Sequence, residues 1–172
     1  MALPRFRPPS PRHAARPAAD LLKTARLRAS RLTEAEIRET MAPIQHCATR
    51  LRQGVATELQ VETLRSTMAI ALAIERLGFV RGMAGHMEAA AIALKSVIDR
   101  ANEAGQWYPV VPHLYEIDAI TCAVDLHEHQ LRQLSAAELQ RAVRRVVAQA
   151  QSQGGGQLLN VTQADLGMEV CP

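Results

Sequence analysis

The chain has 172 residues and a formal net charge of +3, and it is 48% hydrophobic, 22% charged and only 3% aromatic. This length fits one domain, and the composition is that of a globular protein. So few aromatic residues argue against a β-sandwich, a β-barrel or a platform that stacks single-stranded bases, whereas the abundant Ala, Leu, Arg, Gln and Glu favour helices.

The positive charge is concentrated in residues 1–32, which hold eight basic side chains and one acidic one, a net +7 against −4 for the rest. Five of the nine prolines also lie there. Because prolines remove backbone donors and arginines repel one another, we predict a disordered basic arm over residues 1–32. The alternative is that this arm is an upstream extension of the biological chain. A later start is suggested by Met41 and by the first capping box, at Thr33 and Glu36.

A capping box of Thr33 and Glu36 predicts the start of a first helix, which we expect to be kinked or broken at Pro43 and to end near Gly54. In such a box the hydroxyl of the capping residue accepts from the backbone N–H three residues later, and the side chain of that later residue accepts from the N–H of the capping residue. The folded body is therefore predicted to begin at residue 33.

A second capping box, of Thr57 and Gln60, predicts a helix that runs to Gly78. Residues 68–74 of this helix are apolar on every side, although they are too few for the roughly 20 residues of a membrane span. We therefore predict that this second helix is central and buried, with Leu72 in its most apolar stretch.

Three further helices follow in the same manner. The third is predicted from about residue 83 to residue 105, with an inward face of Met87, Ala91, Leu94 and Ile98. The fourth spans roughly residues 113–133. The fifth begins at a capping box of Ser135 and Glu138 and ends at the glycines 154–156, with an inward face of Leu139, Val143, Val146 and Ala150.

These signals predict an all-α fold, an antiparallel helical bundle of about five helices. We expect the bundle over residues 33–153 and a flexible C-terminal tail over 154–172. The three cysteines, Cys47, Cys122 and Cys171, are far apart and form no disulfide framework, and the N-terminus lacks the apolar stretch of a secretory signal. Cytoplasmic localisation without membrane contact is therefore expected.

Several motifs carry a resemblance to known proteins: MAIALAIE at 68–75, IAL at 92–94, GQW at 105–107, IDAI at 117–120 and DLHEHQL at 125–131. With these motifs, residues 33–150 resemble a group of small uncharacterised helical proteins from proteobacterial prophages and mobile elements. Some members of this group are loosely labelled as Fis-like regulators. The resemblance implies a helical accessory protein, and it carries over no binding or catalytic residue.

The pair His127 and His129 suggests a metal site, but residues two apart on a helix point about 200° from each other. Asp125 and His129 share a face, yet neither the HExxH motif nor the Glu-x-x-His pair of di-iron bundles is present. No Gly-x-Ser-x-Gly elbow or P-loop occurs either, and His46 and Cys47 are adjacent and do not face each other. We therefore expect no metal, no cofactor and no enzymatic activity.

His127 falls in a regular apolar seam made by Ile117, Ile120, Val124, Leu131 and Leu134. One interpretation is a pH-sensitive or partner-facing position, because imidazole titrates near neutrality. The other is a core histidine whose nitrogen binds a carbonyl or a buried carboxylate. We favour the second, because buried polar groups are usually satisfied locally.

Arginines supply the candidate nucleic-acid contacts. Arg141, Arg144 and Arg145 share one side of the fifth helix, and the arm supplies Arg5, Arg7, Arg12, Arg16, Arg26, Arg28 and Arg31. The turn at residues 134–135 is weakly like a helix-turn-helix, but the fourth helix is long for that motif and Glu138 lies where base contacts would begin. A solvated arginine face is the simpler interpretation of the fifth helix.

We therefore expect a non-catalytic phage or mobile-element accessory or regulatory protein that binds a macromolecular partner through its bundle. A protein partner is favoured over DNA, and a homo-oligomer is left open. The alternative is a nucleic-acid-binding, transcription-regulator-like protein that uses the basic arm and the fifth helix.

Overall fold

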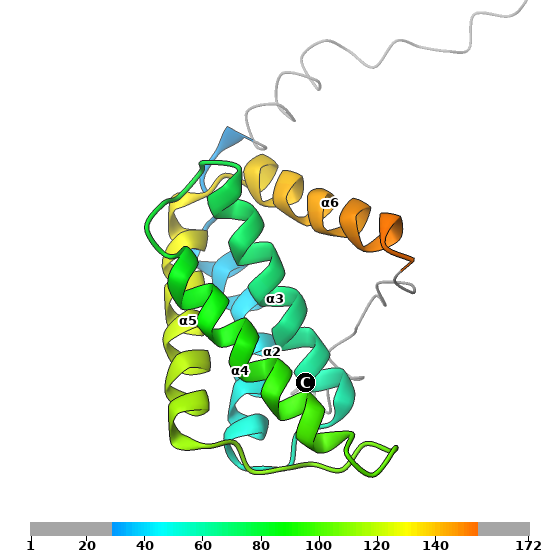
Figure 1. The fold of residues 1–172 in the computed structure, drawn as a ribbon. Coiled ribbons are helices and arrows are strands. Elements are labelled where there is room, and N and C mark those ends of the chain that lie inside the picture. The colour runs from blue at the N-terminus through cyan, green and yellow to red at the C-terminus, as the bar shows by residue number, and fades with distance from the viewer. Residues whose placement is uncertain (1–28, 155–172) are drawn as a thin grey trace, which may run out of the picture.

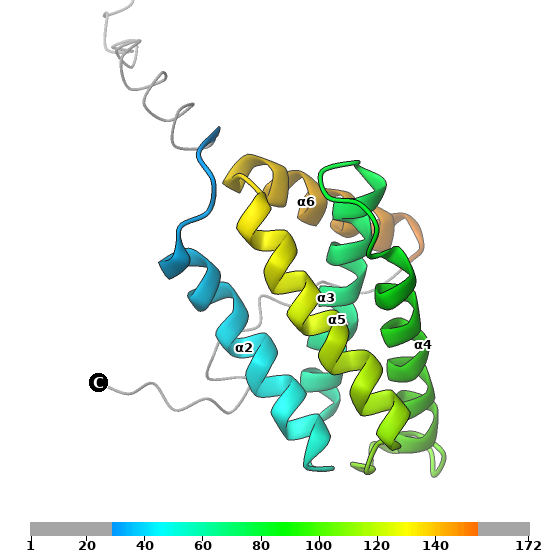
Figure 2. The ribbon, with the colours of Figure 1, turned by 90° about the vertical axis from the view of Figure 1, so that its left-hand side faces the viewer.

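The computed structural model describes residues 29–154, which form five helices around a hydrophobic core. These are α2 (Glu34–Arg52), α3 (Glu58–Arg76), α4 (Ala84–Ala101), α5 (Leu114–Gln133) and α6 (Ala136–Ser152). Helices α2 to α5 lie side by side and alternate in direction, and α6 crosses one end of them (Figures 1 and 2). The all-α prediction is confirmed, and the only β-type pairing within residues 29–154 is one isolated bridge.

The three predicted capping boxes are all formed. In each box the hydroxyl of Thr33, Thr57 or Ser135 accepts from the backbone N–H three residues later. The side chain of that later residue accepts in return from the N–H of the cap. Two amides that the helix itself leaves unpaired are thereby satisfied, so these three helices begin where the local sequence predicts.

Helix α2 is continuous through Pro43, so the predicted break is wrong. A proline inside a helix costs roughly 3 kcal/mol, because it removes one hydrogen bond and crowds the preceding turn. The helix persists because its apolar face is buried on both sides of the proline, through Ile37, Met41, Ile44, Cys47 and Leu51. Burying several such side chains at about 1.5–3 kcal/mol each outweighs the cost.

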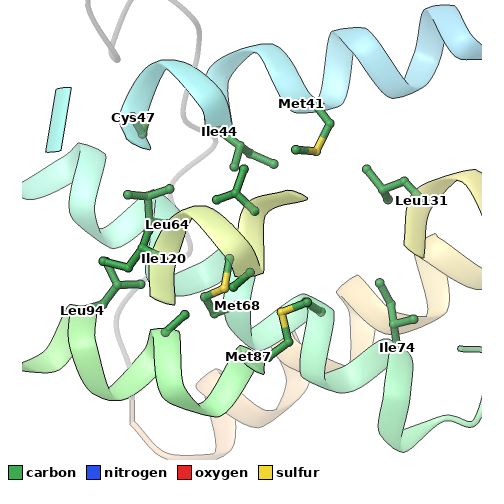
Figure 3. Packing of buried hydrophobic residues seen from close by; sticks show 14 of the residues in the cluster. Met41, Ile44, Cys47, Leu64, Met68, Ile74, Met87, Leu94, Ile120 and Leu131 are labelled. Carbon is green, nitrogen blue, oxygen red and sulfur yellow. The ribbon is translucent and has the colours of Figure 1, made fainter. Parts of the chain in front are cut away.

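Helix α3 contacts each of the other four helices, which confirms the prediction that it is central. Its side chains Leu64, Met68 and Ile74 are fully buried and meet the apolar residues of its neighbours (Figure 3). Leu72 is only half-buried, however, because it lies on the side of α3 that faces α6. The apolar stretch at 68–74 therefore packs partly into the core and partly against α6, where it is less completely covered.

Helix α4 turns a different face inward from the predicted one. Met87 and Leu94 are buried as expected, whereas Ala91 and Ile98 are only half-buried. Both faces alternate spacings of three and four, but at about 100° per residue Ala90 and Val97 lie on the opposite side of Met87 and Leu94 from Ala91 and Ile98. The buried residues include Ala90 and Val97, so the inward face is rotated toward them around the helix axis.

Helix α6 departs most from the predicted bundle. It packs against α3 rather than forming an antiparallel pair with α5, although only Leu134 and Ser135 separate α5 from α6. Contacts of α5 with α2 and α4 already occupy two of its sides, and Leu134 is extended and buried. Of the predicted inward face, Leu139, Val143, Val146 and Ala150 are half-buried, and Ala142 is the one fully buried residue of α6.

Candidate partner-binding surface

The loop at residues 102–113 joins α4 to α5 across the end of the bundle where α2 turns into α3 (Figure 1). Two hydrogen bonds fix this loop. The indole Nε1 of Trp107 donates to the carbonyl of Ala56 at 3.2 Å, and the N–H of Tyr108 donates to the carbonyl of Ala101 at 2.8 Å. Trp107 therefore ties the loop to the α2–α3 turn.

The same loop packs closely on the backbone of Gly54, which lies in the turn between α2 and α3. Gly54 has a φ of 71°, and a Cβ atom placed there would lie 2.7 Å from Cγ2 of Val111. Glycine is therefore required at this position for two reasons, the left-handed backbone and the close approach of Val111. The α2–α3 turn and the α4–α5 loop thus fit against each other at this end of the bundle.

An ion pair between a partly exposed arginine and a buried carboxylate fixes the far side of the loop. Both carboxylate oxygens of Glu116 on α5 accept from the Arg100 guanidinium on α4, at 2.8 and 2.6 Å. The carboxylate also accepts from the N–H of His113 at 2.7 Å, which caps the start of α5. Although Glu116 is fully buried, the hydrogen bonds from Arg100 lower its pKa to about 2. It is therefore ionised and holds the end of α4 against the start of α5.

This anchored end of the bundle displays a set of exposed apolar side chains, which we call the end patch. Its members are between 41% and 81% exposed, and they are Val55, Tyr108, Val111, Leu114 and Tyr115. The Tyr115 ring stacks on that of His113 with 5.6 Å between the centroids. Among the described residues only one other large apolar side chain, Ile92 on α4, is similarly exposed, so the exposure is concentrated at this end.

His127, the candidate in the apolar seam, lies in the core at 2% exposure. Its Nδ1 lies 3.1 Å from Oε1 of Gln130, whose Nε2 donates to the carbonyl of Ala71 on α3. Burial lowers the pKa of His127, against a smaller raising effect of the Gln130 hydrogen bond. The arrangement matches the core-histidine interpretation, and the side chain does not reach a partner-accessible surface.

The candidate arginines of α6 are not equivalent. Arg141 lies over the ring of Phe79, with 5.2 Å from Cζ to the ring centroid, in a cation–π contact. Arg144 and Arg145 are exposed, and Arg145 lines a groove between α3 and α6.

Of the arm arginines, only Arg31 belongs to the described residues. It forms an antiparallel bridge with Ser135, and the next residue, Leu32, donates its N–H to the carbonyl of Leu134 at 3.0 Å. Residues 31 and 32 are therefore paired with the start of α6. The tail from residue 155 lies outside the described residues. The other arm candidates also lie outside them, and they are Arg5, Arg7, Arg12, Arg16, Arg26 and Arg28.

Sequence reasoning missed the end patch. The stretch 108–112, Tyr-Pro-Val-Val-Pro, predicts a loop, and its apolar content was the available signal, because loops without a binding role are usually polar. Val55 belongs to a separate turn, and no sequence pattern pairs that turn with this loop. Only the Trp107 and Val111 contacts bring the two together.

Within residues 29–154, no three His, Cys, Asp or Glu side chains come close enough to hold a metal ion, and no helix there is long and apolar enough to cross a bilayer. Cys122 on α5 and His86 on α4 come together on the exposed surface, with 3.8 Å between Sγ and Nδ1. No protein-family model, curated protein or solved structure matches this chain.

Proposed function

We propose that this protein is a non-catalytic accessory or regulatory protein that binds a protein partner through the end patch. The observation that carries the proposal is the exposure of five large apolar side chains at one end of the bundle, on the α2–α3 turn, the α4–α5 loop and the first residues of α5. Contiguous exposed apolar groups mark interaction surfaces, and tyrosine is enriched at the centres of protein interfaces. Both tyrosines of the chain belong to this patch.

The anchoring contacts support the same proposal. A surface that is already ordered loses little conformational entropy when a partner binds, so more of the contact energy remains as affinity. The Arg100–Glu116 pair and the Trp107 hydrogen bond hold the loop without using any end-patch side chain. We further propose, on the sequence resemblance alone, that the protein serves a prophage or mobile element and acts in the cytoplasm.

Site-directed photo-crosslinking in cells of the native host tests the proposal. The crosslinker p-benzoylphenylalanine replaces Tyr115 in the patch, and in a control chain it replaces Ile92, which is 72% exposed on α4. We expect one recurrent protein adduct at position 115, absent at position 92 and lost when Leu114→Ser is added. Equal adducts at both positions, or adducts that survive Leu114→Ser, would refute the end patch. An adduct of twice the chain mass would identify a second copy as the partner.

The second candidate function is nucleic-acid binding by the arm and α6. The observation that favours it is the pairing of Arg31 with Ser135, the N-cap of α6, the helix that also carries the exposed Arg144 and Arg145. Engagement of about five arm charges would give a log–log salt slope near roughly −4.5 on duplex DNA. Fluorescence anisotropy with random duplex and the chains 1–172 and 29–172 tests this. Equal binding by both chains would exclude the arm.

A further inference from the structure

Helices α3 and α6 enclose a groove at the end of the bundle opposite the end patch. The two helices converge where α3 ends and α6 begins, and they diverge toward the end of α6 (Figure 1). The space between them is a groove of about 230 Å³. Its apolar lining comes from both helices, with Leu72 and Ala73 on α3 and Val146 and Ala150 on α6.

Arginines form the rim of this groove. Arg65 and Arg76 on α3 and Arg145 on α6 all line it. Arg65 pairs with Glu62 at 2.6 Å, whereas Arg76 and Arg145 make no ion pair with any residue of the described range 29–154. The groove therefore presents two guanidinium groups that have no ion-pair partner within residues 29–154.

The acidic residues of α3 and α6 that are nearest in sequence to Arg76 and Arg145 are already engaged. The Glu75 carboxylate accepts from the N–H groups of Gly82 and Met83, at 2.6 and 3.0 Å, and so holds the turn that follows α3. Glu138 is committed to the capping box of α6, where it accepts from both the N–H and the hydroxyl of Ser135. An internal rearrangement that pairs Arg76 or Arg145 with these acids would break a helix cap or a turn.

The apolar lining is also left incomplete. Helix α6 has one fully buried residue, and Val143 and Val146 are only partly buried along the diverging part. Leu72 on α3 is also only partly buried. A segment that lay in the groove would cover apolar surface on both helices, and at about 25 cal/mol per Å² this burial favours association.

We propose that the α3–α6 groove binds an acidic amphipathic helix of a partner protein. The apolar face of that helix covers Leu72 and Val146, and its acidic side chains pair with Arg76 and Arg145. This is the helix-in-groove mode of recognition, in which apolar anchors give affinity and rim charges give selectivity. A nucleic-acid backbone would engage the arginines but leave the apolar lining uncovered. The proposal does not rest on the end patch, which lies at the other end of the bundle.

The test uses the full chain and, as probe, a phage-displayed library of random 16-residue peptides. We expect the enriched peptides to carry a net negative charge and apolar residues spaced three and four apart. Their affinity, measured by fluorescence anisotropy, should fall about tenfold or more in the variant Arg76→Glu/Arg145→Glu, because attraction at both rim charges becomes repulsion. Arg144→Glu, on the same helix but outside the groove lining, is the matched control and should change the affinity by less than about twofold.

A charge swap separates direct contact from an effect on folding. Replacing the acidic residues of the best peptide by lysine should restore binding to Arg76→Glu/Arg145→Glu and abolish binding to the unaltered chain. Both positions are exposed, so thermal melts should show all variants folded. The proposal is overturned if no peptide is enriched, if the enriched peptides are basic or neutral, or if the double variant binds them unchanged. It is also overturned if the double variant loses affinity for random duplex DNA while peptide binding persists.

Discussion

Helices α5 and α6 follow each other in the chain with two residues between them, yet they are held very differently. Helix α5 contributes seven buried residues and contacts α2, α3 and α4. Helix α6 contributes Ala142 alone and packs on α3. The comparison teaches that local signals decide where a helix begins, whereas the number of neighbouring helices decides how much of it is buried.

The largest effect is expected where the bundle is densest. Met68→Asp should abolish cooperative folding, because Met68 is fully buried and an uncompensated buried carboxylate costs roughly 3–5 kcal/mol in a protein whose total stability is of similar size. Leu72→Asp, one helical turn away, should be less destabilising and remain folded, since Leu72 is only partly buried and lines the groove beside α6, where a carboxylate can reach water. Thermal unfolding followed by circular dichroism measures both. Equal loss for the two variants would mean that α6 seals α3 as tightly as the bundle does.

A smaller loss is expected at the polar clamp between α4 and α5. Glu116→Gln should lower the free energy of unfolding at pH 7 by about 1.5–3 kcal/mol, because the charge-assisted hydrogen bonds from Arg100 to the buried carboxylate are lost. Urea unfolding provides the measurement. Glu62→Gln, which removes an exposed ion pair on α3, is the control and should cost less than about 1 kcal/mol.

The Glu116 carboxylate should also make the free energy of unfolding decrease at acid pH. Its folded pKa is about 2, against an ordinary value of 4.5, so the unfolded chain binds the proton first and the stabilisation is lost as the pH falls from 4.5 toward 2. In Glu116→Gln this contribution should be absent, so the variant should approach the stability of the unaltered chain at low pH. If the difference in the free energy of unfolding between the two chains stayed constant from pH 6 to pH 2.5, the ion-pair assignment would be contradicted.

A further pH dependence is expected from His127, which links α5 to α3 through Gln130. Burial lowers its pKa below 6.5, so the unfolded chain takes up a proton that the folded core refuses. Stability should therefore fall as the pH drops below 6.5, above the range in which Glu116 acts. His127→Asn should flatten the dependence of stability on pH between pH 6.5 and 5, whatever the absolute stability of the variant. Urea unfolding midpoints determined at each pH measure this dependence. A slope that persists in the variant would assign it to another group.

The smallest effect is expected in α6. Val146→Ala should cost less than about 1 kcal/mol, because the side chain is half-exposed and the cavity opens to the groove. Leu64→Ala in α3, where the side chain is fully buried, should cost about 2–5 kcal/mol. Chemical denaturation of both variants gives the comparison directly. A loss at Val146 as large as that at Leu64 would show that α6 belongs to the core.

Much of the fold followed from the sequence because its signals are local. The hydroxyl and the acid of a capping box lie within one turn, so Thr33, Thr57 and Ser135 predict helix starts without knowledge of any neighbour. The spacing of the α5 seam likewise predicted that His127 would be inside. These features depend on residues three or four apart, whose geometry the helix itself determines.

Tertiary structure decided the rest, because it depends on contacts between residues far apart in the chain. Helix α2 passes through Pro43 only because burial on both sides outweighs the local penalty. The end patch exists because Trp107 reaches Ala56, and the α3–α6 groove exists because α6 packs on α3 and not on its sequence neighbour α5. Helical periodicity records which face of a helix is apolar, but only the packing of all five helices determines which part of that face remains uncovered.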